Sequence, residues 1–254
     1  MKLFIIMLCI FFMGNVYAAN TKGQKETLAD YIMNLPLQNE KSTPGAGLYH
    51  HNGTFKDGDT ILDANDGSYR YAGKDTVENP INNYVCMDSD ATSCPEDKLY
   101  RIIGVFDGKV KVIKNTSIGD IKWNLASPAY HYGSNTWSRS NLKRQLNGEL
   151  DDSSPEKNYY NSIESLINSG KIEKHTWSVG GNTMDNIARV AILSVAYQNE
   201  VVNPSGANSI TGEKYWTGYI GLMYASDYGF AAEPSNWGTT LESYIGVPHN
   251  SDWL

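Results

Sequence analysis

The sequence predicts an α+β fold, an antiparallel sheet with short helices, and three observations lead to this prediction. Two β-rich runs, 99–106 and 109–114, are joined by Asp107-Gly108, a residue pair that suits a type I′ hairpin turn because both positions need positive φ. Helical patterns such as 138–148 are short and end at turn residues. Strand and helix patterns do not alternate regularly, which argues against a parallel α/β sheet.

The hairpin also predicts how its sheet is exposed. In the second run, Val110 and Val112 should face one way, and Lys109 and Lys111 the other, because side chains alternate along a strand. We therefore expect one face of the sheet to be covered by the core and the other to be wet, as in many antiparallel sheets.

The remaining elements follow from periodicity and from turn residues. Period-2 or buried-strand patterns bounded by turn-formers predict strands at 68–72, 83–87, 171–178 and 216–223. Apolar residues at helical spacing predict helices at 28–35, 138–148 and 159–167, which Pro36, Asn147-Gly148 and Gly170 end, and a short helical turn at 225–231. Ser138 or Ser140 should cap the second helix, and Ser226 or Asp227 the last. The segment 186–197 suits either a helix or a strand.

The first residues have the order of a secretory signal peptide. Lys2 supplies a positive charge, 3–13 form an apolar run, and small residues lead to Ala18-Ala19. The run is too short for a permanent membrane span, which needs about 20 apolar residues. We therefore expect residues 1–18 to be removed and the mature chain to begin at Ala19, secreted or at the cell surface.

Three segments follow from this organisation: a signal peptide over 1–18, an N-terminal helix and linker over 19–46, and a single α+β domain over 47–254. The helix of the second segment either docks on the domain or acts as a spacer, and the pattern does not decide between the two. After cleavage about 236 residues remain, which is enough to bury a sizeable core.

Composition limits the partners. The formal charge of −7 gives no basic footprint for nucleic acid, and no stretch after the leader is apolar enough to span a membrane. Tyr, Asn, Ser and Gly are abundant, as in secreted β proteins and in binding surfaces. We expect a glycan or a surface protein as the partner, and no cofactor.

Two cysteines remain once Cys9 leaves with the leader. Cys86 and Cys94 lie eight positions apart, and in an exported chain the simplest expectation is one local disulfide. The alternative is a pair of free thiols. The spacing excludes a CxxC redox or zinc site, and no histidine lies near the pair, so no metal role is expected.

Four blocks in order carry a resemblance: LYRIIGVF (99–106), NTWSRSNL with LNG (135–148), TGYIGLM (217–223) and ASDYGFA (225–231). Together they resemble an uncharacterised family of secreted domains from low-GC, often gut-dwelling, bacteria, over about 68–254. The second block is distantly similar to domains with a C-type-lectin or formylglycine-generating-enzyme-like fold. The resemblance therefore implies a C-type-lectin-like α+β domain, in a fold that is non-catalytic in most of its relatives.

Two departures from that pattern bear on function. Longer members of the family continue past the Asp252-Trp253-Leu254 found here, so the resemblance implies a domain that lacks its last strands and exposes unpaired backbone. The formylglycine-generating chemistry uses cysteines near the C-terminus, whereas this chain has no cysteine after Cys94. That activity is not expected here.

Candidate ligand-binding residues are Trp237, Trp253 and Asn236, because indole faces match the C–H faces of pyranoses and amides bond sugar hydroxyls. His50 and His51 are expected in a solvated loop. The oxygen-rich segment 57–66 lacks EF-hand spacing and is expected to form ordinary turns, so no metal site is assigned.

No catalytic set is recognised, so we expect a non-catalytic secreted or surface-associated binding or display domain, with glycan or protein as its ligand. The alternative is an extracellular hydrolase of polysaccharide or cell wall, with paired carboxylates. Its candidates are Glu164, Glu173, Asp185 and Glu242.

Overall fold

The computed structural model describes residues 8–12, 18–19, 25–89, 92–124, 136–149, 159–179, 191–204 and 213–240. The strands are β1 (Leu8–Phe12), β2 (Ala18–Ala19), β3 (Lys25–Glu26), β4 (Gly47–His50), β5 (Lys56–Asp57), β6 (Thr60–Ile61), β7 (Tyr69–Ala72), β8 (Tyr84–Cys86), β9 (Leu99–Phe106), β10 (Lys109–Lys114), β11 (His175–Ser178), β12 (Tyr215–Gly218) and β13 (Ile220–Leu222). The α-helices are α1 (Leu28–Met33), α2 (Asn141–Asn147), α3 (Glu164–Asn168), α4 (Leu193–Tyr197) and α5 (Ala225–Phe230).

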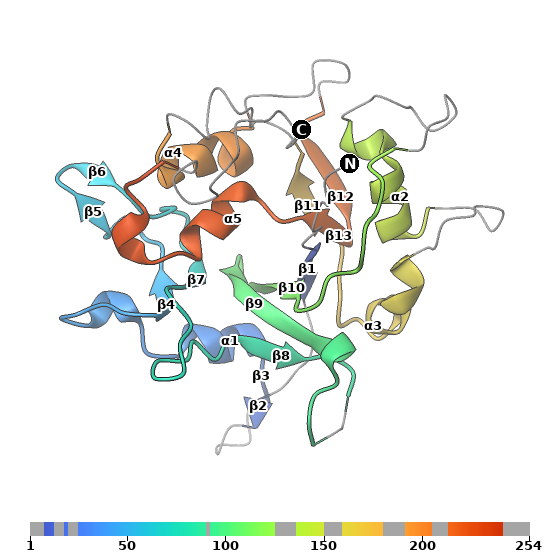
Figure 1. Cartoon of the computed structure of the whole chain (residues 1–254), viewed down its shortest axis with the longest axis horizontal. Coiled ribbons are helices and arrows are strands. Elements are labelled where there is room, and N and C mark those ends of the chain that lie inside the picture. The colour runs from blue at the N-terminus through green and yellow to red at the C-terminus, as the bar shows by residue number, and fades with distance from the viewer. Residues whose placement is uncertain are drawn as a thin grey trace.

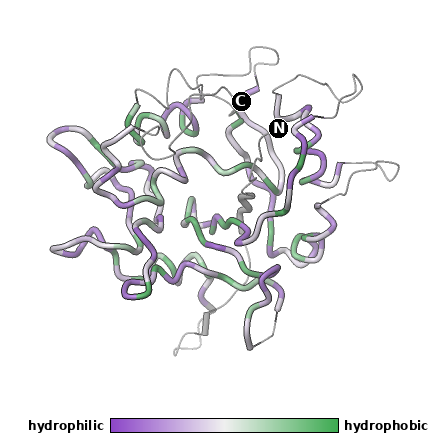
Figure 2. The backbone as a smooth tube through the Cα atoms, in the orientation of Figure 1, coloured by the Kyte–Doolittle hydropathy of each residue, from purple (hydrophilic) through white to green (hydrophobic). Residues whose placement is uncertain are grey.

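Within the described residues, seven strands form one antiparallel sheet in the order β13-β1-β10-β9-β7-β4, and β8 pairs with β9 (Figure 1). Strands β11 and β12 form a separate two-stranded ribbon. The α+β class is therefore confirmed. Figure 2 shows that hydrophobic residues gather in the central strands and that hydrophilic residues dominate the outer loops.

Both faces of the large sheet are covered. Val110 and Val112 of β10 point into the main core, which α1, α2 and α3 help to cover. On the opposite face, Ile113 packs with Trp177 of β11, and α4 and α5 add Leu193, Tyr197 and Phe230. The sheet is thus the middle layer between two apolar layers.

The hairpin prediction is confirmed, but the prediction of a wet face is wrong. Strands β9 and β10 pair in register across Asp107 and Gly108, whose φ values are 49° and 73°. Lys111, however, has a side chain only 1% exposed, because α5 and the β11–β12 ribbon form a second layer over that face. The alternation is as predicted, and only the environment of the lysine differs.

The helices follow the sequence signals in most places. Ser140 caps α2 through a hydrogen bond from the Lys143 amide, and Gly148 ends it at φ 76°. Helix α5 begins two or three residues earlier than the predicted caps Ser226 or Asp227: its N-cap is Tyr224, whose amide donates to the Asp227 carboxylate at 3.2 Å. Segment 186–197 lies partly outside the described residues, and its described end is helical.

In the N-terminal region, the structure decides the role of helix α1 and places a strand inside the predicted signal peptide. Helix α1 buries Ala29 and Ile32 in the main core, so it docks on the domain and is not a spacer. Strand β1, inside the predicted signal peptide, lies in the large sheet between β10 and β13 and pairs antiparallel with both. In the described part of the chain, no helix is long and apolar enough to cross a membrane.

The predicted disulfide between Cys86 and Cys94 is present, and the two Cα atoms lie 5.7 Å apart. It closes the loop between β8 and η2 (Glu96–Lys98), next to the start of β9. The bridge therefore closes the loop that joins β8 to β9.

Replacing both Cys86 and Cys94 by alanine should lower the free energy of unfolding by about 2–3 kcal/mol, because the crosslink restricts the unfolded chain. Urea unfolding monitored by tryptophan fluorescence would measure the change. The reduced wild-type protein is the matched control and should unfold at the same midpoint as the double variant. An unchanged midpoint in both would contradict the expected contribution.

Candidate functional site: a buried ionic network

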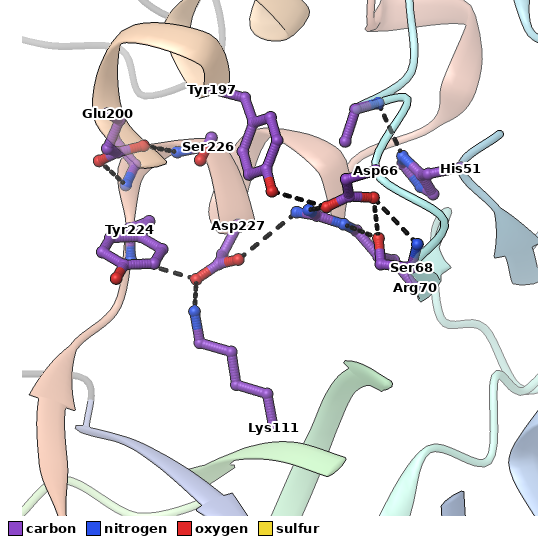
Figure 3. A network of polar contacts seen from close by, with 12 residues as sticks. His51, Asp66, Ser68, Arg70, Lys111, Tyr197, Glu200, Tyr224, Ser226 and Asp227 are labelled. Carbon is purple, nitrogen blue, oxygen red and sulfur yellow. Dashed lines mark hydrogen bonds and ion pairs between the residues drawn. The ribbon is translucent and has the colours of Figure 1, made fainter. Parts of the chain in front are cut away.

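Ionisable side chains meet between the sheet and the layer formed by α4 and α5. We define the ionic network as Asp66, Arg70, Lys111, Tyr197 and Asp227 (Figure 3). Asp66 lies in the loop before β7, Arg70 is on β7 and Lys111 is on β10, while Tyr197 ends α4 and Asp227 is in α5. The network therefore joins two strands of the sheet to both helices of the covering layer.

Arg70 is the centre of the network and is almost completely buried. Its Nη2 donates to Asp66 Oδ2 at 2.6 Å, and its Nη1 lies 3.6 Å from Asp227 Oδ1. The guanidinium also lies 4.6–5.0 Å from the ring centroids of Phe106, Tyr197 and Phe230. Two carboxylates and three aromatic faces thus replace the water that this cation loses on burial.

Lys111 forms the second buried ion pair. Its ammonium donates to Asp227 Oδ2, and both side chains are 1% exposed. The same ammonium lies 4.2 Å from the ring centroid of Tyr224, the N-cap residue of α5. Asp227 therefore lies beside two cations, and its Oδ2 also accepts a hydrogen bond from the Tyr224 amide. These contacts hold α5 against β10.

The electrostatics of the network keep the Asp66 carboxylate ionised. Burial alone would raise the pKa of Asp66, but the Arg70 charge and hydrogen bonds from Ser68 and Tyr197 outweigh it and hold that pKa well below its usual range. Burial raises the pKa of Tyr197, so its hydroxyl stays protonated and donates to Asp66 Oδ2 at 2.7 Å. The two cations and two carboxylates of the network sum to zero charge.

Glu200 extends this polar region along the N-terminus of α5. It lies in η7 (Gln198–Val202), and its carboxylate accepts from the Ala225 and Ser226 amides at 2.9 and 3.0 Å. Burial raises the pKa of this carboxyl against the opposing effect of those hydrogen bonds. Its two oxygens thus bind the free N–H groups at the helix start.

His51 is fully buried beside the network, so the expectation of a solvated loop for it is wrong. Its Nδ1 accepts from the Ala64 amide at 3.0 Å, and its ring lies against Phe230 and Trp237 at 5.0 and 4.9 Å between centroids. Burial, followed by the Arg70 charge, lowers the pKa of His51 well below its usual value. His51 is therefore a neutral core residue, and nothing in the His50-His51 dipeptide signals this.

The predicted ligand-binding residues are separated by the structure. Trp237 is 0% exposed and packs in the core with Tyr49, Phe55 and Phe230, so its ring is not available to stack on a sugar. Asn236 is exposed in η8 (Pro234–Asn236). Trp253 lies outside the described residues. The structure thus removes Trp237 from the predicted site and leaves Asn236 at the surface.

In the acidic loop 57–66, a buried carboxylate binds backbone amides. Asp63 is buried and its carboxylate accepts from the amides of Gly53, Phe55 and Asn65. Asp66 belongs to the ionic network, and Asp57 and Asp59 are exposed. Among the described residues, no three side chains of the metal-ligating types come together.

The carboxylates proposed for hydrolysis are not brought together either. Glu173 forms an ion pair with Lys109, Glu164 is exposed on α3, and Asp185 and Glu242 lie outside the described residues. Asp66 and Asp227 both form ion pairs with Arg70. A glycosidase needs one carboxylic acid and one carboxylate facing a substrate, and these two are both neutralised by buried cations.

No protein-family model, curated protein or solved structure matches this chain.

Replacing Lys111 by methionine should lower the free energy of unfolding by about 3–5 kcal/mol, because the buried Asp227 loses the closer of its two cations. Urea unfolding would measure the loss. Lys109→Met is the matched control on the same strand, where a partly exposed pair should contribute less than about 1 kcal/mol. The double variant Lys111→Met/Asp227→Leu should lose less than the sum of the single losses, and strict additivity would contradict the pairing.

Stability should fall as the pH drops below the ordinary pKa of histidine, about 6.5. The folded-state pKa of His51 is lowered, so the unfolded chain binds the extra proton, and the loss should approach about 1.4 kcal/mol per pH unit. Asparagine can still accept from the Ala64 amide, so His51→Asn should flatten the curve between pH 7 and pH 5. Burial also lowers the pKa of His175, to about 4, but this effect cancels between the two proteins. Equal slopes would refute the assignment.

Proposed function

We propose that this chain is an exported, non-catalytic binding domain whose ligand is a protein. The observation that carries the proposal is the ionic network: within the described part of the chain, its buried charged side chains pair with one another and hold the fold together. Lys111, Arg70 and two carboxylates neutralise each other, and Glu200 binds the start of α5. Such a network supports a rigid scaffold.

A protein ligand is favoured over a glycan by the position of the aromatic residues. Trp237, the described tryptophan offered for sugar stacking, is enclosed by Tyr49, Phe55 and Phe230. Exposed tyrosines are present at Tyr31, Tyr84, Tyr215 and Tyr228, and tyrosine is common on protein-binding surfaces because it offers contact area at low entropic cost. Export is supported by the leader sequence.

Protein recovered from the culture medium should begin at Ala19, as intact-mass measurement and N-terminal sequencing would show. Purified residues 19–254 should release no reducing sugar from cell-wall or plant polysaccharides above a heat-denatured control. They should also give no signal on a glycan array. Sugar release that rises in proportion to protein concentration would favour the hydrolase alternative, and retention of the uncleaved chain inside the cell would contradict export.

A further inference from the structure

We propose that removal of residues 1–18 opens a strand-binding slot in the sheet, and that the slot binds an apolar β-strand from a different polypeptide. We define the strand slot as the position between β10 and β13, which β1 fills in the intact chain (Figure 1). This inference rests on the proposed function and names the site and the chemistry of its partner.

The backbone pairing shows what is lost with the leader. β1 pairs with β10 from Cys9↔Ile113 to Phe12↔Val110, and with β13 from Leu8↔Leu222 to Ile10↔Ile220. Among the described strands, β13 pairs in the sheet with β1 alone. Without β1, two facing strand edges have unpaired N–H and C=O groups, and such edges are templates for another strand.

The far wall of the slot is held independently of β1. Asn147 of α2 accepts from the Ile220 amide and donates to the Ile220 carbonyl, each at 3.0 Å. Trp177 packs directly on Gly221, where a Cβ atom would lie 2.4 Å from the indole, and its Nε1 donates to the Gly218 carbonyl at 3.0 Å. A side-chain amide and an indole therefore keep β13 in place, so the slot is preformed.

The burial of both walls defines the ligand. Val110, Val112 and Ile220 belong to the main core on one face of the sheet. Ile113 packs with Trp177 on the other face. A strand between them is covered on both faces, so it should be apolar at every position that lacks a buried counter-charge such as the one Asp227 provides for Lys111 of β10. The present occupant, Leu-Cys-Ile-Phe-Phe, has this composition.

The occupant must come from another polypeptide because the mature sequence does not contain a suitable one. From residue 20 onward, the chain has no uninterrupted run of five residues drawn from the apolar set Ala, Val, Ile, Leu, Met, Phe, Trp, Tyr and Cys. A second mature copy lacks such a run for the same reason. The partner is therefore a protein that offers a continuous apolar segment in extended form, antiparallel to both β10 and β13.

Hydrogen–deuterium exchange on residues 19–254 and on the uncleaved chain, produced without export, tests the slot. The probe is a synthetic peptide with the sequence of residues 8–12 flanked by lysines. Apart from the Ile220 amide, which Asn147 binds in both forms, the amides of β13 should exchange rapidly in the mature chain and slowly in the uncleaved one. Peptide at about ten times its Kd should slow them about tenfold, and the same peptide with Ile10→Pro should not. Protection of β13 without peptide, or none with it, would overturn the proposal.

Crosslinking tests the register independently. Cys9 lies opposite Ile113, and directly opposite residues share a face of the sheet. The peptide thiol should therefore form a mixed disulfide with Ile113→Cys about tenfold faster than with Val112→Cys, whose side chain points to the other face. Equal rates would reject the register. If either variant does not fold, exchange on the unmodified mature chain still decides.

Failure of the slot would be distinguishable from failure of the proposed function. A mature chain that is exported and binds a protein, yet shows neither protection nor crosslinking, would keep the proposed function and lose the slot. A chain that binds the peptide but also hydrolyses polysaccharide would lose the non-catalytic function and keep the slot. Replacing Asn147 by alanine should weaken peptide binding although Asn147 does not contact the peptide. The reason is that β13 loses the two hydrogen bonds that hold it in place.

Discussion

The ion pair between Lys111 and Asp227 determines how the second layer of this protein sits on its sheet. Lys111 projects from the middle of β10 toward an apolar layer, where an unpaired ammonium would be very unfavourable. Asp227 resolves this by reaching from α5, and its other oxygen lies near Arg70 on β7. The position of α5 is therefore fixed by charge as much as by packing. Glu200 extends the same effect to the turn that follows α4, because it accepts the Ala225 amide of α5.

Apolar side chains alone would allow several placements of these short helices. The buried helices α4 and α5 have five and six residues, and helices this short have little stability of their own. Asp66 and Asp227 each accept a cation in one geometry, so a shifted helix would leave a buried charge without its partner. We regard the ionic network as a device that selects one packing among several similar ones.

The local elements were predictable because their signals are local. Asp107-Gly108 determines the hairpin turn, and Ser140 with Gly148 determines the ends of α2. The buried site was not predictable because alternation shows that Lys111 is opposite Val110 and Val112, but not whether another layer covers it. Its partner Asp227 is 116 positions away. Trp237 is a similar case, since a tryptophan beside a Pro-containing turn gives no sign in the sequence that its ring points inward.

The position of β1 has a consequence for the order of events during biogenesis. A segment that forms an interior strand once the domain has folded is no longer accessible to a targeting receptor or to a peptidase. In the export that we propose, recognition of the leader would therefore come before closure of the sheet, and the polypeptide would cross the membrane while still unfolded. On that route, oxidation of Cys86 and Cys94 and assembly of the charged interior would follow on the far side of the membrane, after release of the leader.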